Sequence, residues 1–141
     1  MGKYYLAVFS EETWNIFLQA SNKQYATKLT KESRARRINK GDFFLCYVTK
    51  KSAIVGLLEI VSEAYIGESN IYGDSDLPVC LDCEAVICHS VEDGIPIKKI
   101  MDKISFLQNV RNTKKWATFF WNPLNEFPER DAEILIQYLR Q

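Results

Sequence analysis

Three segments of strand character follow one another between residues 43 and 90, and no helix of crossover length separates them. They cover residues 43–48, 53–63 and 80–90, with a short turn between the first two and a loop rich in Gly, Ser, Asn and Asp before the third. Parallel neighbours in a sheet need crossover connections of a dozen or more residues, usually helices. The succession therefore argues against a doubly wound sheet and favours a small α+β barrel with a mixed sheet.

Weaker signals surround this block of strands. Residues 3–9 predict a first strand, and residues 11–18 predict a helix with Ser10 as its N-cap. The helical spacing of apolar side chains predicts a terminal helix at residues 129–140. Shorter helical turns are expected at 34–38 and 97–104, a last strand at 115–120, and polar loops at 19–33 and 65–77. The pattern predicts four or five strands with helices at the ends of the sheet.

The length of 141 residues suits one domain, which we expect to span residues 1–141. The content of 47% apolar and 26% charged residues is typical of a soluble globular protein. No apolar run reaches the length of about 18 residues that a membrane span needs, so no membrane association is expected. The four cysteines are interpreted as buried free thiols, which favours a cytoplasmic location.

Catalytic chemistry finds little support in the sequence. Cys80 and Cys83 form a CxxC pair, but residues three apart on a strand point to opposite faces and cannot share one metal ion. His89 is the only histidine, and the chain has neither a GxxxxGK[ST] nor a GxGxxG loop. We therefore expect no catalytic residue, no metal and no cofactor. A small metal-dependent enzyme that uses acidic residues with the two cysteines stays open as an alternative.

The aromatic residues are more informative. Four of them fall within residues 116–121, just before Asn122 and ahead of the charged pair Arg130 and Asp131. Three tyrosines occur in segments that otherwise have loop composition: Tyr25, Tyr65 and Tyr72. Aromatic faces beside amides and charges suit a pocket that stacks a flat ring and hydrogen-bonds its edge. The alternative role for the loop tyrosines is to cap the core.

Positive charge is concentrated in one segment, although the net charge of the chain is zero. Residues 23–40 hold seven basic residues against the single acid Glu32, whereas residues 61–97 hold eight acids and no Lys or Arg. A basic segment of this kind either contacts phosphates or forms a solvated surface. Charge alone leaves both alternatives open.

Several motifs, taken in order, resemble EVE domains. They are Lys3-Tyr4-Tyr5-Leu6-Ala7-Val8, Trp14, the segment 36–48 around Lys40-Gly41-Asp42, the segment 54–65, Phe106-Leu107, Lys114-Lys115-Trp116 and Phe127-Pro128-Glu129-Arg130-Asp131. The segment 122–126, together with Arg130 and Asp131, is also similar to the end of YTH domains. The resemblance covers nearly the whole chain. It implies a PUA-like/EVE mixed β-barrel flanked by short helices.

The resemblance also implies a function. In these relatives a modified base is flipped into an aromatic cage: methylated adenine in YTH domains and modified cytosine in several EVE domains. A non-catalytic module that binds DNA or RNA carrying methylated adenine, or methylated or hydroxymethylated cytosine, is therefore expected. Some such domains are the N-terminal specificity module of McrB-type modification-dependent restriction systems, so a fused or associated NTPase or nuclease is an implied partner.

Site residues follow from the resemblance and from the basic segment. The base cage is expected from Tyr25, Tyr72, Tyr65 and Trp116. Contacts to the base edge are expected from Ser10, Asn15, Asn122 and Asp131. Phosphate contacts are expected from Arg34, Arg36, Arg37, Lys40 and Arg130. The alternative binding function is that of a PUA-like RNA-binding protein that holds unmodified RNA through the basic segment and flips no base.

Overall fold

The computed structural model describes residues 2–104 and 119–141. In these residues the strands are β1 (Tyr4–Phe9), β2 (Gln24–Thr27), β3 (Phe43–Val48), β4 (Ala53–Ile60), β5 (Tyr65–Ile66), β6 (Val79–Cys88), β7 (Ile95–Pro96) and β8 (Glu126–Phe127). The α-helices are α1 (Glu11–Gln19), α2 (Glu32–Ala35) and α3 (Glu129–Leu139). The 3₁₀ helices are η1 (Leu29–Lys31), η2 (Ile97–Lys99) and η3 (Met101–Lys103).

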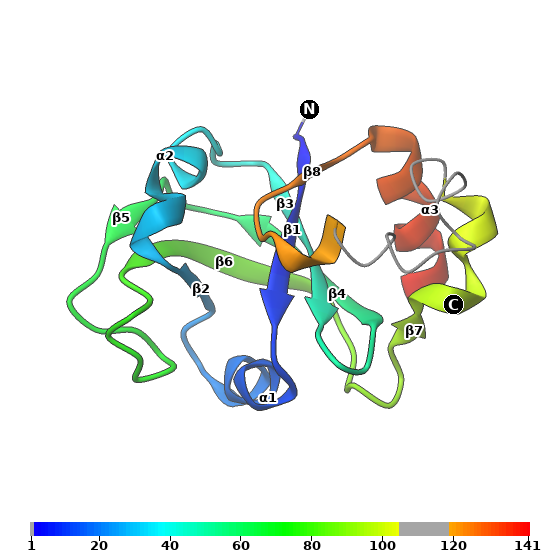
Figure 1. Ribbon diagram of the computed structural model, residues 1–141, viewed down its shortest axis with the longest axis horizontal. Coiled ribbons are helices and arrows are strands. Elements are labelled where there is room, and N and C mark those ends of the chain that lie inside the picture. Colours follow the sequence, from blue (N-terminus) through cyan, green and yellow to red (C-terminus); the bar gives the residue numbers. More distant parts are fainter. Residues whose placement is uncertain (1, 105–118) are drawn as a thin grey trace.

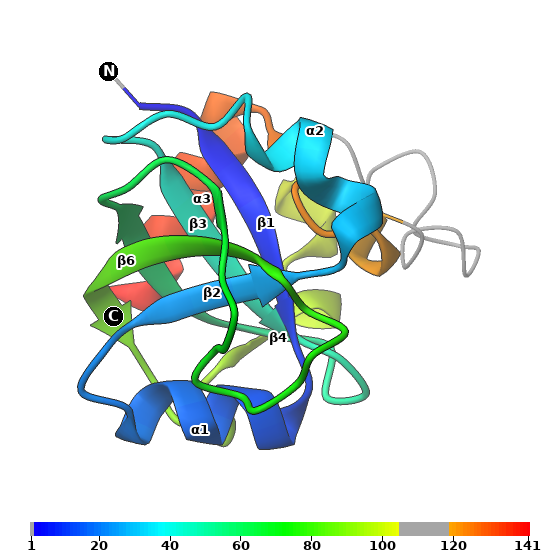
Figure 2. The same cartoon turned by 90° about the vertical axis from the view of Figure 1, so that its left-hand side faces the viewer.

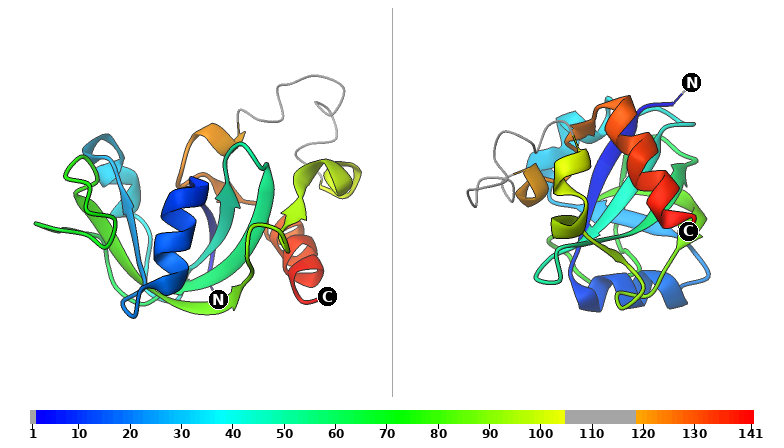
Figure 3. Two further views of the ribbon diagram at one scale, coloured as in Figure 1. Left: turned by 90° about the horizontal axis from the view of Figure 1, so that it is seen from below. Right: turned by 90° about the vertical axis from the view of Figure 1, so that its right-hand side faces the viewer.

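The strands form one curled sheet in the order β2-β6-β4-β3-β1-β8, with β5 paired to β6 and β7 paired to β4. β1 runs parallel to β3, whereas β4 is antiparallel to both of its long neighbours, β3 and β6. Register shifts after Cys46 in β3 and after Leu57 in β4 mark bulges, which increase local twist. The sheet curves around α1, and α3 lies outside the curve (Figure 1, Figure 3). The predicted α+β fold with a mixed, barrel-like sheet is confirmed.

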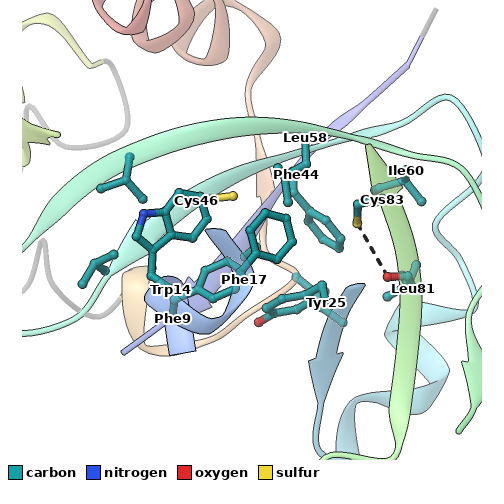
Figure 4. Packing of buried hydrophobic residues seen from close by; sticks show 14 of the residues in the cluster. Phe9, Trp14, Phe17, Tyr25, Phe44, Cys46, Leu58, Ile60, Leu81 and Cys83 are labelled. Atoms are coloured by element: carbon teal, nitrogen blue, oxygen red, sulfur yellow. Dashed lines mark hydrogen bonds between the residues drawn. The ribbon is translucent and has the colours of Figure 1, made fainter. Parts of the chain in front are cut away.

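Side chains alternate between the two faces of the curled sheet along each strand, and both faces are apolar because nearly every residue of β3 and β4 is apolar and buried. On the inner face, Phe9 and Phe44 pack with Trp14 and Phe17 of α1 (Figure 4). The rings of Trp14 and Phe17 are stacked with their centroids 5.2 Å apart. The outer face packs against α3 through a second cluster that includes Leu135. The inner cluster fixes α1 at the end of β1.

Both ends of α1 have specific caps. The hydroxyl of Ser10 accepts the backbone N–H of Thr13, and the hydroxyl of Thr13 accepts the backbone N–H of Ser10. This reciprocal capping box satisfies two amides at the start of the helix, where Ser10 was predicted as the N-cap. At the other end, the ammonium group of Lys23 donates to the carbonyls of Phe17 and Leu18 at 2.8 and 3.0 Å. The caps hold α1 in a fixed position relative to β1 and β2.

Four parts of the prediction need correction, the first being the number of strands, because the described residues form eight strands rather than four or five. β2 and β5 lie in segments that were expected to be loops, and residues 97–104 form two 3₁₀ helices rather than one helix. Residues 119–121 form a 3₁₀ turn instead of the end of a strand, while residues 115–118 lie outside the described residues. β2 lacks an alternating pattern because all four of its residues are buried, including the polar Gln24 and Thr27. No helix in the described ranges is long and apolar enough to cross a membrane.

Candidate functional site

A pocket with a volume of about 380 Å³ lies where β1 ends and α1 begins. Four aromatic residues line it, from four different parts of the chain: Phe9, Tyr25, Tyr72 and Trp121. The loop between β5 and β6, which carries Tyr72, passes in front of β2 and approaches α1 (Figure 2). The pocket is therefore assembled by the fold, with one wall from the barrel strands and another from this loop.

Tyr25 forms the inner wall of the pocket. Its ring lies 5.3 Å from that of Phe9 and 5.0 Å from that of Phe44, and only 3% of the residue is exposed (Figure 4). Its hydroxyl accepts a hydrogen bond from the backbone N–H of Val8. Burial raises the pKa of this phenol above its ordinary value, so the ring stays neutral. The Tyr25 ring is thus neutral and fixed at the inner end of the pocket, where it is almost fully buried.

Tyr72 forms the wall on the loop side. Its hydroxyl donates to the backbone carbonyl of Gln24 at 2.6 Å, which fixes the ring against β2. The Tyr72 ring centroid lies 6.5 Å from that of Phe9. Burial raises the pKa of Tyr72 as well. Both tyrosine walls are thus held by hydrogen bonds between their hydroxyls and the backbone.

The loop itself is fastened to the barrel by side-chain amides. The Gln24 side chain accepts the backbone N–H of Ile71 at 3.1 Å and donates to the Tyr65 hydroxyl at 2.7 Å. Tyr65 in turn donates to Asp82 at 2.6 Å. Within the loop, the side chain of Asn70 donates to two carbonyls and accepts the N–H of Tyr72. These bonds set the position of Tyr72 from residues that do not line the pocket themselves.

Polar and charged groups surround the aromatic walls. The serine and threonine residues of the lining are Ser10, Thr13 and Thr27, and Ser10 is exposed. Two basic residues also line the pocket, Lys28 just after β2 and Lys31 at the end of η1. Trp121, which is 70% exposed, also belongs to the lining. The site therefore combines flat apolar faces with hydroxyl groups and positive charge at its rim.

The structure brings three of the predicted site residues together and leaves others apart. Tyr25, Tyr72 and Ser10 line the pocket, whereas Tyr65 supports the loop through Gln24 and Asp82. Residues that lie outside the lining are the exposed Asn15, Asn122 and Arg130 and the buried Asp131. Trp116 is not among the described residues.

The predicted phosphate-binding residues also lie outside the lining of the pocket. Arg34 donates to the side chain of Asn125 at 3.1 Å, and Arg36 forms an ion pair with Glu32 at 2.7 Å. Arg37 and Lys40 are exposed further along the chain. Sequence reasoning missed Lys28, Lys31 and Trp121 as individual residues. The available signals were the basic segment 23–40, which contains both lysines, and the aromatic run 116–121, which contains the tryptophan.

Groups that could support catalysis are engaged elsewhere in the fold. His89 has one ring nitrogen 2.7 Å from the carbonyl oxygen of Leu139. Burial raises the pKa of Cys80, and it raises that of Cys83 to about 12, so both thiols are protonated at neutral pH. In the two described ranges no three His, Cys, Asp or Glu side chains gather closely enough to hold a metal ion.

The comparisons with known proteins agree with this architecture. The sequence model of the EVE domain matches residues 3–123, and the chain belongs to the EVE domain family. The UPF0310 protein PYRAB08750 of Pyrococcus abyssi is 25% identical and is aligned over 94% of this chain and 96% of its own length.

Solved structures with the same fold include the protein Rpa0253 and several structures of YTH domains. Rpa0253 of Rhodopseudomonas palustris has a TM-score of 0.65 at 15% identity, covering 96% of this chain and 92% of its own. The YTH domain of Zygosaccharomyces rouxii MRB1, solved in complex with N6-methyladenosine RNA, has a TM-score of 0.70 at 11% identity and covers 99% of this chain and 87% of its own. At these identities the likeness shows the fold, which is shared by EVE and YTH domains.

Proposed function

We propose that this protein binds nucleic acid carrying a modified base and holds that base, flipped out of its strand, in the pocket between Tyr25 and Tyr72. The observation that carries the proposal is the pocket itself, where aromatic faces from separate elements meet beside Lys28 and Lys31. Its volume of about 380 Å³ falls in the range of small-molecule sites. The fold is that of YTH domains. The YTH domains of Mmi1 and MRB1 have been solved with RNA, that of MRB1 with N6-methyladenosine RNA, and the YTH domain of Pho92 has been solved with m6A.

In such a site the cost of flipping a base is of the same size as the gain from stacking it on aromatic side chains. Removing a base from its stack costs a few kcal/mol. Aromatic side chains return about 1–3 kcal/mol for each base they stack. A methyl group that becomes buried adds about 0.8 kcal/mol, which corresponds to about a fourfold preference from apolar transfer alone. A modified base can thus be selected without any covalent chemistry.

The candidate ligands are methylated adenine, methylated cytosine and hydroxymethylated cytosine, in DNA or RNA. Ser10, an exposed residue of the lining whose hydroxyl also caps α1, is the candidate contact to the base edge. In this proposal the protein has no catalytic role and acts in the cytoplasm as a specificity module. Any nucleotide hydrolysis or strand cleavage, as in a modification-dependent restriction system, belongs to a fused or associated NTPase or nuclease.

A binding panel tests the proposal. Fluorescence anisotropy is measured with matched DNA and RNA strands whose central base is unmodified or carries one of the three modifications. We expect one modified strand to bind at least about threefold more tightly than its unmodified match. Tyr72→Ala should abolish that preference, whereas Tyr138→Ala, a half-buried tyrosine of α3 away from the pocket, should keep it. Equal binding of every pair by the unaltered protein would refute the proposal.

A second candidate function is the binding of unmodified RNA, and the two lysines at the rim favour it. Lys28 and Lys31 can contact phosphates of any strand, because phosphate contacts carry no sequence information. In that case the panel would show RNA binding with no effect of modification, and Tyr72→Ala would leave the affinity unchanged.

A further inference from the structure

Trp121 differs from the other aromatic residues of the pocket in its exposure to solvent. It is 70% exposed, whereas Tyr25 and Phe9 are 3% and 2% exposed. The other tryptophan in the described ranges, Trp14, is fully buried, and its indole N–H donates to the carbonyl of His89 at 2.9 Å. A large apolar ring that remains mostly in water beside a binding pocket still has most of its surface available to a ligand.

The position of Trp121 decides which part of a ligand it can meet. The residue lines the pocket together with Pro123, yet its high exposure places most of the indole outside the enclosed volume. Lys28 and Lys31 line the same pocket. The rim of the pocket therefore combines one free aromatic face with two cations, a pairing typical of surfaces that follow a single strand.

When one base of a strand enters the pocket, the stacking and the position of the adjacent base are constrained. Because the inserted base has left the stack, its neighbour has lost a stacking partner on that side. The neighbour must also stay within one phosphodiester linkage of the pocket. An exposed indole at the rim can restore the lost stacking, and rim lysines can contact the linking phosphate.

We propose that Trp121 forms a second subsite, which stacks the nucleotide adjacent to the base held in the pocket, while Lys28 and Lys31 contact the phosphates that join the two. This inference rests on the proposed function, because it needs a base in the pocket to define the neighbour. The recognised unit is then a dinucleotide rather than a single base. Trp121 contributes to the affinity for strands and leaves the affinity for a free modified nucleoside unchanged.

The experiment combines variants of the rim with ligands that lack a neighbouring base. The probes are a single-stranded heptamer whose central modified base gives the tightest binding in the panel above, two heptamers with an abasic site on its 5′ or 3′ side, and the free modified nucleoside. If the panel shows no preference, the unmodified heptamers and nucleoside serve. The proteins are the unaltered chain, Trp121→Ala, Trp121→Phe and Leu29→Ala. Leu29 is 58% exposed and lies outside the pocket lining, so it controls for loss of an exposed apolar residue.

The expected result is a coupling between Trp121 and one neighbouring base. Trp121→Ala should weaken binding of the complete heptamer about 5- to 100-fold, and Trp121→Phe should weaken it less. The abasic site on one side should weaken binding by the unaltered protein by a similar factor, and Trp121→Ala should then add no further loss. Leu29→Ala should have no effect on any probe. Circular dichroism of each variant verifies that the fold is intact.

Three outcomes would overturn the subsite. Equal weakening of the free nucleoside by Trp121→Ala would make Trp121 a wall of the base pocket itself. If the losses from Trp121→Ala and from the abasic site multiply independently, Trp121 does not contact the neighbouring base. The same conclusion follows if Trp121→Ala causes no loss of affinity. If only the selectivity of the proposed function fails, the result is different: modified and unmodified strands bind equally, while the coupling between Trp121 and the abasic site persists.

Discussion

The hydroxyl oxygen of Tyr25 lies 3.1 Å from the backbone nitrogen of Val8, whose N–H it accepts, and 3.4 Å from the carbonyl oxygen of the same residue, to which it donates. β2 is at one end of the sheet order, and β1 lies next to the other end. A side chain therefore joins two strands that no ladder connects. This contact fastens the half-barrel beside the pocket, so Tyr25 is both a wall of the site and part of the closure of the fold.

Replacing Tyr25 by Phe separates these two roles. Tyr25→Phe keeps the ring but removes the acceptor of the N–H of Val8, a half-buried residue, and the loss of such a hydrogen bond costs about 0.5–1.5 kcal/mol. We expect the free energy of unfolding in urea to fall by that amount, while the affinity for the preferred strand changes less than about threefold. An unchanged stability would show that the hydroxyl does not fasten the barrel.

The sequence predicted the long elements well because their patterns are local. Phe43–Val48 and α1 follow from apolar runs and from the cap at Ser10, all within a few residues. β2 was missed because its polar end is buried by distant partners. Gln24 bonds to Tyr65 and to the backbone of Ile71, 41 and 47 residues away.

The site was predicted only in part, for the same physical reason. The pairing of β2 with β6 and the hydrogen bond from Tyr72 to Gln24 bring Tyr25 and Tyr72 to one pocket. Family resemblance pointed to both residues, but composition could not show that they meet. Exposure separates Trp121 from the other aromatic residues of the lining, and no sequence pattern reports the exposure of a tryptophan in an aromatic run.

The Gln24 side chain should control the order of the loop that carries Tyr72. Gln24→Ala removes the acceptor of the Ile71 N–H and the donor to Tyr65, so we expect faster hydrogen exchange at Ile71 and Tyr72. Affinity for the preferred strand should fall about 3- to 30-fold, as ordering the loop becomes a cost of binding. Gln137→Ala, on the exposed side of α3, provides the matched control. Unchanged exchange at Ile71 would show that the loop is held by other contacts.

Buried thiols and phenols predict a loss of stability at alkaline pH. Burial raises the pKa of Cys83 from 9.0 to about 12. Below pH 9 both the folded and unfolded thiols are protonated, so the stabilising contribution is complete; it is lost as the pH rises from 9 towards 12, because only the unfolded chain then ionises. Between pH 7.5 and 10.5, urea denaturation should show a decrease that is about 2 kcal/mol larger in the unaltered protein than in Cys83→Ala. Equal decreases would contradict this assignment.

Lys28 and Lys31 should contribute affinity without selectivity. Because each phosphate contact on a single strand adds about 0.7 to the slope of log affinity against log salt, the double Ala variant should lower that slope by about 1.4. Modified and unmodified strands should lose affinity equally. The double variant Lys98→Ala with Lys99→Ala, exposed lysines outside the pocket, removes the same charge and should leave the slope nearly unchanged. A larger loss for the modified strand would place the lysines at the base rather than at the backbone.

The central claim is that a modified base occupies the pocket between Tyr25 and Tyr72, and amide chemical shifts test it most directly. The protein is titrated with a modified strand and with its unmodified match, and the two shift maps are subtracted. We predict that the difference is concentrated at pocket residues such as Ser10, Ala26 and Tyr72 and is absent from Gln137 on α3. A difference map that is empty, or that lies along α3 and spares the pocket, would contradict the account.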